Sequence, residues 1–258
     1  MVALCAGALP SAGCGKVKAT TNPTVAESEA PAMPAPTAAS SPSSSPSTSA
    51  STPPVAAKAT VEPASPQSDE EPLLKVPRPP IISRQQWNAR KTRGEGKSHE
   101  IDRITIHHTG VAQKPATTIE KKLQGLQIYS QSESKLANGK LKPAWLDVPY
   151  HFYVSVDGKI GEGRPIKYVS DTNTEYDPTR HATIVVEGNF ENEKPTEAQS
   201  KALQDLTVWL SVKYQVPKSR IKAHNDYART LCPGVNLKRA LPALVEKVAE
   251  LAGVPESR

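Results

Sequence analysis

Proline is concentrated in the first 75 residues of the chain, where 12 of the 25 prolines lie among many serines and alanines. A stretch such as APAMPAPTAASSPSSSPSTSASTPP has too few large apolar side chains to offset the entropy lost when its backbone becomes ordered. We therefore predict a disordered linker over residues 17–75. The folded core must come from residues 76–258, which are enough for one domain with a substantial buried interior.

The first 16 residues, MVALCAGALPSAGCGK, are apolar and rich in small side chains as far as Cys14. This pattern is typical of the end of a secretory signal followed by a bacterial lipoprotein acylation site. Ser11 stands where such sites usually carry an aliphatic residue, so the pattern leaves open whether Cys14 is lipidated. We expect export to the bacterial cell envelope, with an outer-membrane lipoprotein facing the periplasm as the lipidated form. No apolar run is long enough to predict a membrane-spanning helix.

Charge divides the chain at the same place as proline does. Residues 1–75 carry four Lys/Arg against six Asp/Glu, so with +6 overall the remaining residues carry +8. A basic domain suits an anionic partner such as nucleic acid, a lipid surface or an acidic cell-wall polymer, and solubility is an equally good explanation. We find no basic run interleaved with aromatic residues, which argues against nucleic acid. The three cysteines, Cys5, Cys14 and Cys232, imply no disulfide framework.

Strand and helix patterns alternate in the second part of the chain. Alternating β-branched residues predict strands at 103–108 and 181–190, and on both sides of an Asp-Gly turn within 150–160. Apolar residues at helical spacing predict helices, the second of which begins with a capping box at Thr196, over residues 116–131, 195–214 and 238–253. Pro242 is expected in the first turn of the last helix. This order predicts an α/β domain with one central sheet packed by helices.

Two adjacent histidines end the strand predicted at 103–108. Because side chains alternate across a strand, His107 shares a face with the polar Thr105, whereas His108 shares the other face with the apolar Ile106. We expect His108 to be buried against a helix and His107 to lie where the end of the strand opens into a cleft.

A second group of chemically active residues lies in the segment AHNDYARTLCPG, where His224 and Cys232 are eight residues apart. Histidine and thiolate are the commonest protein ligands of zinc, and a histidine from a distant strand would complete a three-ligand site with its fourth position open. Hydrolysis requires that open position, because a bound water becomes a nucleophile near neutral pH. The spacing alone is weak, and Cys232 could equally be a small buried residue before a turn.

Four segments, IISRQQWNAR, ITIHHTG, DVPYHFYVSVDGKIGEGRP and AHNDYARTLCPG, resemble in order and spacing the type 2 N-acetylmuramoyl-L-alanine amidase family. The family shares its fold with peptidoglycan recognition proteins, and the resemblance extends over roughly residues 81–240. It implies an α/β fold with a single central mixed sheet. It also implies a catalytic Zn²⁺ held by His107, His224 and Cys232.

The resemblance implies catalytic roles for Tyr150 and Thr230. Tyr150 would donate a hydrogen bond to the metal-bound water or the developing oxyanion, which its phenol can do without being charged. Thr230 stands where family members carry lysine or threonine facing the zinc, and a hydroxyl stabilises an oxyanion less than an ammonium does. Val185 stands where some members have a general-base glutamate. Glu187, two residues on, is either a replacement base or a solvated carboxylate at the end of a strand.

We therefore expect residues 76–258 to be a zinc amidase domain that cleaves the amide between N-acetylmuramic acid and L-alanine of the peptidoglycan stem peptide. Its partners would be peptidoglycan or muropeptides, with no nucleic acid. The alternative is a recognition module that binds peptidoglycan without cutting it when a zinc ligand is lost, and the presence of Cys232 argues for the enzyme. His151 and His181 are expected to be structural. The sequence leaves open the choice between intact wall and 1,6-anhydromuropeptides, the third-position diamino acid and the oligomeric state.

Overall fold

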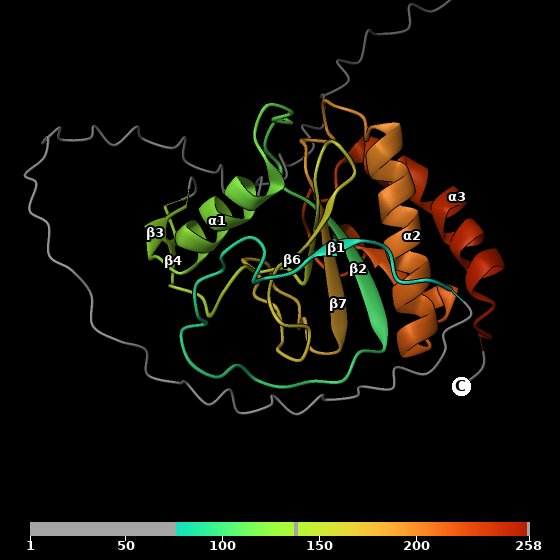
Figure 1. The fold of residues 1–258 in the computed structure, drawn as a ribbon, viewed down its shortest axis with the longest axis horizontal. Helices are drawn as coiled ribbons and strands as arrows, with labels where there is room; N and C mark the ends of the chain where they lie inside the picture. The colour runs from blue at the N-terminus through green and yellow to red at the C-terminus, as the bar shows by residue number, and fades with distance from the viewer. Residues whose placement is uncertain (1–75, 137–138, 257–258) are drawn as a thin grey trace, which may run out of the picture.

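The computed structural model describes residues 76–136 and 139–256 (Figure 1). The predicted signal-like segment and linker, including Cys14, lie outside the described residues. The helices and strands follow in the order β1 (Ile81–Ile82), β2 (Arg103–His108), α1 (Ile119–Ser130), β3 (Ser134–Lys135), β4 (Leu141–Lys142), β5 (Phe152–Val154), β6 (Ile160–Glu162), β7 (His181–Val186), α2 (Glu197–Tyr214), the 3₁₀ turn η1 (Lys218–Arg220), β8 (Ile221–Ala223), the 3₁₀ turn η2 (His224–Asp226) and α3 (Val235–Ala252).

Six strands form a central sheet in the order β1-β6-β5-β7-β2-β8, while β3 and β4 form a separate pair. Strand β2 is parallel to both of its neighbours, β7 and β8, whereas β5 and β6 are antiparallel. The antiparallel pair is joined by the predicted Asp-Gly turn, where Gly158 has φ +79° and a side chain would meet the backbone of Ala198. The predicted α/β fold with a single central mixed sheet is confirmed.

The two faces of the sheet are covered by different helices, as Figure 1 shows, with α2 and α3 on one side and α1 on the other. Alternate residues of β2 and β7, among them Ile106 and Ile184, pack with buried residues of α2 and α3 such as Leu206. The opposite face places Val185 with Leu123 of α1 in a smaller apolar cluster. This alternation confirms the assignment of β2 residues to two faces.

Helix α2 begins as its sequence predicts. The Thr196 side chain accepts a hydrogen bond from the backbone N–H of Gln199 at 3.0 Å, and the Gln199 side chain accepts one from the Thr196 N–H at 3.1 Å. These reciprocal bonds satisfy two N–H groups that have no partner within the helix. The capping box is therefore confirmed.

The prediction for the last helix is wrong at its start. Helix α3 begins at Val235, so Pro242 lies inside it rather than in its first turn. An interior proline removes one helical hydrogen bond and costs about 3 kcal/mol. Leu237, Leu241 and Val248 are all buried, and this long apolar contact with the core offsets the local cost.

Among the described residues, no helix has the length and apolar character required to cross a membrane.

Candidate metal centre

His107, His224 and Cys232, which the sequence analysis selects as metal ligands, lie together and buried. One ligand atom from each of them lies within 4.8 Å of the other two, and Cys232 Sγ is 3.7 Å from His107 Nδ1. Zinc binds sulfur at about 2.3 Å and nitrogen at about 2.0 Å, so two such donors on one tetrahedral ion stand about 3.5 Å apart. The observed separation therefore fits two donors to a single zinc ion.

The sheet brings the two histidines to one place. Ile106 of β2 is the register partner of Ala223, the last residue of β8, so the next residue on each chain segment is a histidine: His107 in β2 and His224 at the start of η2. Their ring centroids are 4.4 Å apart. The loop after η2 then returns to β2, because the backbone N–H of His108 donates to Cys232 Sγ at 3.3 Å. His107 and the two ligands from the segment after β8 thus converge at the end of β2.

Burial sets the protonation of these groups. It lowers the pKa of His107 well below its ordinary value and that of His224 to about 4, so both rings are neutral at pH 7, the form that binds metal. Burial also raises the pKa of the Cys232 thiol to about 12, and a bound cation would favour the thiolate instead. The Nδ1 atom of His224 is buried without a hydrogen-bond partner, so its lone pair is available to a metal. The residues present therefore fit zinc.

Tyr150 and Thr230 both lie beside this cluster. The Tyr150 ring centroid is 5.1 Å from that of His107, and burial raises the pKa of Tyr150, which keeps its phenol protonated as a donor. Thr230 Oγ1 accepts a hydrogen bond from the backbone N–H of Cys232 at 3.2 Å. Because the bond uses a lone pair, the hydroxyl proton of Thr230 is free to be donated. The predicted catalytic pair is thus adjacent to the predicted ligands, and its chemical role stays a prediction.

Glu187 differs from one of the two expectations for it. Only 2% of its surface is exposed, so the expectation of a solvated carboxylate is wrong. Its carboxylate accepts hydrogen bonds from Lys122 Nζ at 2.7 Å and from the backbone N–H groups of Lys114 and Val156. A buried carboxylate needs such partners, and these connect the end of β7 to α1 and to the turn after β5. Glu187 thus makes structural contacts at the end of β7, and a role as a base stays a prediction.

His151 and His181 make structural contacts. His151 Nε2 donates to the Tyr168 carbonyl at 2.9 Å, and its Nδ1 accepts from the backbone N–H of Thr183 at 3.0 Å. His181 Nδ1 lies 2.6 Å from the Thr105 hydroxyl. Both rings are buried, and the expectation that they are structural agrees with these contacts.

Sequence reasoning missed two hydroxyl-bearing residues of the segment between β6 and β7. Thr174 Oγ1 lies 2.7 Å from His224 Nε2, and the Tyr176 hydroxyl lies 3.5 Å from His107 Nε2. The Tyr176 ring also stacks on that of Tyr227, with centroids 5.9 Å apart. The segment has no strand or helix periodicity, so no sequence signal marks these residues.

The sequence pattern that defines the N-acetylmuramoyl-L-alanine amidase family matches residues 97–235, which include all three candidate ligands. The chain belongs to this family. The human N-acetylmuramoyl-L-alanine amidase is 28% identical over 163 residues, covering 60% of this chain and 27% of the human protein. The chain therefore corresponds to about a quarter of that relative's length.

Solved structures of two proteins show the same fold as this family member. The endolysin N-acetylmuramoyl-L-alanine amidase LysCS from Clostridium intestinale is 28% identical, with a TM-score of 0.51, covering 65% of this chain and 96% of its own. Human peptidoglycan recognition protein IβC, solved in complex with a glycosamyl muramyl pentapeptide, is 24% identical with a TM-score of 0.54. That match covers 64% of this chain and 95% of the human one. At this identity the recognition protein supports the fold alone.

Proposed function

We propose that this protein is a zinc-dependent N-acetylmuramoyl-L-alanine amidase, which hydrolyses the amide between N-acetylmuramic acid and L-alanine of the peptidoglycan stem peptide. The observation that carries the proposal is the buried set of His107, His224 and Cys232 in a member of this family, with donor atoms within 4.8 Å of one another. Three nitrogen and sulfur ligands leave one tetrahedral position open, which is the form of a catalytic zinc site.

The chain's own residues would divide the work. When bound, zinc supplies Lewis acidity toward a carbonyl oxygen and lowers the pKa of a coordinated water to near neutrality. His107 and His224 bind as neutral rings, and Cys232 binds as the thiolate. The phenol of Tyr150 and the hydroxyl of Thr230 donate hydrogen bonds to the oxygen on which negative charge develops. Because the ligand rings are buried, these hydrogen bonds act where water competes weakly.

A non-catalytic recognition module is the second candidate, and Val185 is the observation that favours it. Val185 is the register partner of His107 on β7, so the two side chains share a face, and Val185 is fully buried. This position therefore provides no carboxylate to accept a proton. Glu187, the nearest acidic residue along the strand, is already bound to Lys122. A recognition module would bind muropeptides and leave the amide intact.

Purified protein incubated with muropeptides, with and without a zinc chelator, tests the proposal. Mass spectrometry should show stem peptide released at the lactyl bond, and the chelator should abolish release. Tyr150→Phe should retain zinc and lose about 10²–10³-fold in kcat, since one oxyanion donor is removed. Binding without release by zinc-loaded protein would support the recognition module instead. An unchanged rate in Tyr150→Phe would remove that residue from the mechanism. The muropeptides that react would define the substrate range.

We also propose export to the bacterial cell envelope with a lipid anchor on Cys14. The small, apolar N-terminal pattern ending at this cysteine supports the proposal. Mass spectrometry of the mature N-terminus in a bacterial host should find an acylated Cys14, and Cys14→Ala should release the protein from membranes. An unmodified N-terminus on membrane-free protein would contradict the anchor.

A further inference from the structure

Both candidate histidine ligands have their second ring nitrogen beside a hydroxyl from one short segment, residues 172–176. The contact to His224 is close, with Thr174 Oγ1 2.7 Å from Nε2, whereas Tyr176 lies 3.5 Å from His107 Nε2. A neutral imidazole carries one proton, and the partner of one nitrogen decides which nitrogen keeps its lone pair. The segment is therefore placed to select the tautomer of the metal ligands.

For His224 the contacts favour one tautomer. With the proton on Nε2, the ring donates to Thr174 Oγ1 and keeps the Nδ1 lone pair for a metal. With the proton on Nδ1, a buried N–H would have no acceptor, because that atom has no hydrogen-bond partner in the described structure. A buried donor without a partner is costly. Thr174 thus holds His224 in the form that offers Nδ1 to the ion.

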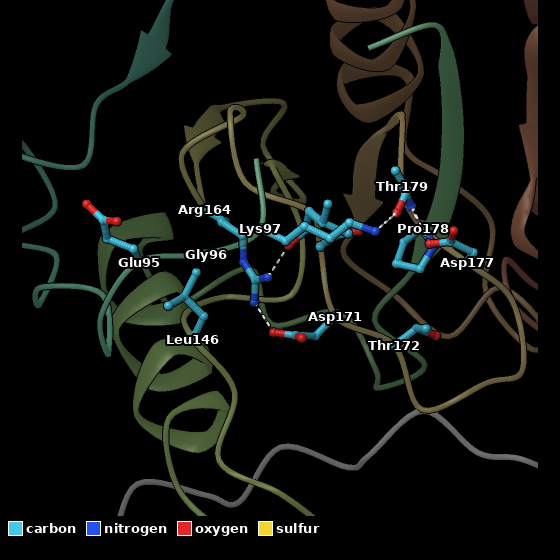
Figure 2. A pocket seen from close by; sticks show the side chains of 12 residues that line it. Glu95, Gly96, Lys97, Leu146, Arg164, Asp171, Thr172, Asp177, Pro178 and Thr179 are labelled. Carbon is cyan, nitrogen blue, oxygen red and sulfur yellow. Dashed lines mark hydrogen bonds and ion pairs between the residues drawn. The ribbon is translucent and has the colours of Figure 1, made fainter. Parts of the chain in front are cut away.

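Thr174 is itself held in place. Its hydroxyl lies 2.8 Å from that of Thr172, and its backbone N–H donates to Thr172 Oγ1 at 3.1 Å. Thr172 lines a cavity of about 400 Å³ next to Asp171, which is paired with the fully buried Arg164 (Figure 2). Arg164 also donates hydrogen bonds to the backbone carbonyls of Val148, in the loop before β5, and of Val169. The segment therefore begins beside a buried arginine that holds Asp171 and two backbone carbonyls.

We propose that Thr174 is a positioning residue of the metal centre, which fixes the Nε2–H tautomer and the orientation of His224 and is supported by Thr172. Tyr176 acts on His107 in the same way through a longer and weaker contact. The inference rests on the proposed zinc site and deepens it. Residues 172–176, which lie outside any helix or strand, would thus set the tautomers of both histidines in the metal-free protein.

Thr174→Val tests the proposal, because valine keeps the branched shape and removes the hydroxyl. Competition with a chromophoric chelator should show zinc affinity about 10–100-fold weaker, the usual loss when the outer partner of a ligand is removed. Thr174→Ser should restore affinity close to that of the parent protein. Thr179→Val is the matched control in the same loop, since its hydroxyl binds Lys97 rather than a ligand, and it should not change affinity.

A second measurement needs no zinc. In metal-free protein, long-range ¹H–¹⁵N spectra should show His224 protonated on Nε2, and Thr174→Val should convert it to a mixture of tautomers. The proposal is overturned if the tautomer and the zinc affinity of Thr174→Val both equal those of the parent, or if Thr179→Val weakens zinc equally. Failure of the proposed function differs, because zinc-loaded parent protein would then leave muropeptides intact while these tautomer and affinity results stand.

Discussion

The two faces of the central sheet are built from alternate residues of the same strands and do different work. The face under α2 and α3 is mainly apolar, with Ile106, Val154 and Ile184 all fully buried, and His108 lies at its end. The other face carries His107 and the buried polar residues near the candidate metal centre. Continuous burial of apolar area stabilises the first face. The second face buries more polar groups, each of which needs a specific hydrogen-bond or ionic partner, and so gains less free energy from apolar burial.

The adjacent histidines give the sharpest test of this comparison. His107→Ala should abolish zinc binding and amidase activity, because one of three ligands is lost. His108 Nδ1 instead accepts the backbone N–H of Phe190 at 3.3 Å, so His108→Ala should retain zinc and cost about 1–3 kcal/mol of unfolding free energy. Metal analysis and urea denaturation measure both effects. Full activity in His107→Ala would exclude the proposed site.

The buried ion pair tests the polar face for stability. Lys122 and Glu187 are each less than one-tenth exposed, with nitrogen and oxygen 2.7 Å apart. Lys122→Met should destabilise the protein by about 3–5 kcal/mol, because it leaves a buried charge unpaired. Adding Glu187→Gln should recover much of the loss. Equal denaturation midpoints for the parent and Lys122→Met would show that the pair does not hold α1 to the sheet.

The pH dependence of stability should test the cost of burying a neutral histidine. Burial lowers the pKa of His151 to about 3, from 6.5 in the unfolded chain. Below pH 6.5 the unfolded state therefore binds a proton that the folded state does not, so stability is full above pH 6.5 and falls as the pH is lowered toward 3. Between pH 7 and pH 5 the loss from this group should reach about 2 kcal/mol. In His151→Gln the same comparison by urea denaturation should show a smaller loss, and an identical loss would assign the effect to other groups.

The apolar face should respond least to a small change. Ile184→Val removes one buried methylene group from the apolar cluster between β7 and the helices, and should cost about 0.5–1.5 kcal/mol without altering zinc affinity. Thermal unfolding and chelator competition on the same sample would show it. A change in zinc affinity would mean that the two faces are coupled through the sheet.

Local patterns in the sequence were sufficient for the long elements. Strand β2 spans the predicted residues 103–108, and the capping box at Thr196 starts α2 one residue later. The alternation of side chains along β2 was also enough to assign His107 and His108 to opposite faces of the sheet. Each of these depends on neighbouring residues, for which periodicity and capping chemistry are direct signals.

The misses depend on partners far along the chain. Buried Glu187 accepts a hydrogen bond from Lys122 of α1, and no residue near Glu187 in the sequence predicts that partner. Thr174 meets His224 through the fold alone. Strands β1, β3 and β4 have two residues each, too few to show an alternation. The start of α3 differs from the predicted residue 238 because local preference favours proline in the first turn, whereas the buried Leu237 lies before that residue and extends the contact with the core.

Strand β8 is a three-residue strand at the edge of the sheet, and it leads directly into His224. An ion held by His107, His224 and Cys232 would therefore act as a cross-link between this edge strand and its neighbour β2. Such a link closes a long loop of the chain, from His107 to His224, and stabilises the folded state, in which the three ligands lie together. We expect zinc to slow amide hydrogen exchange at β8 more than in α2. Loss of the ion would then be coupled to fraying of the last strand.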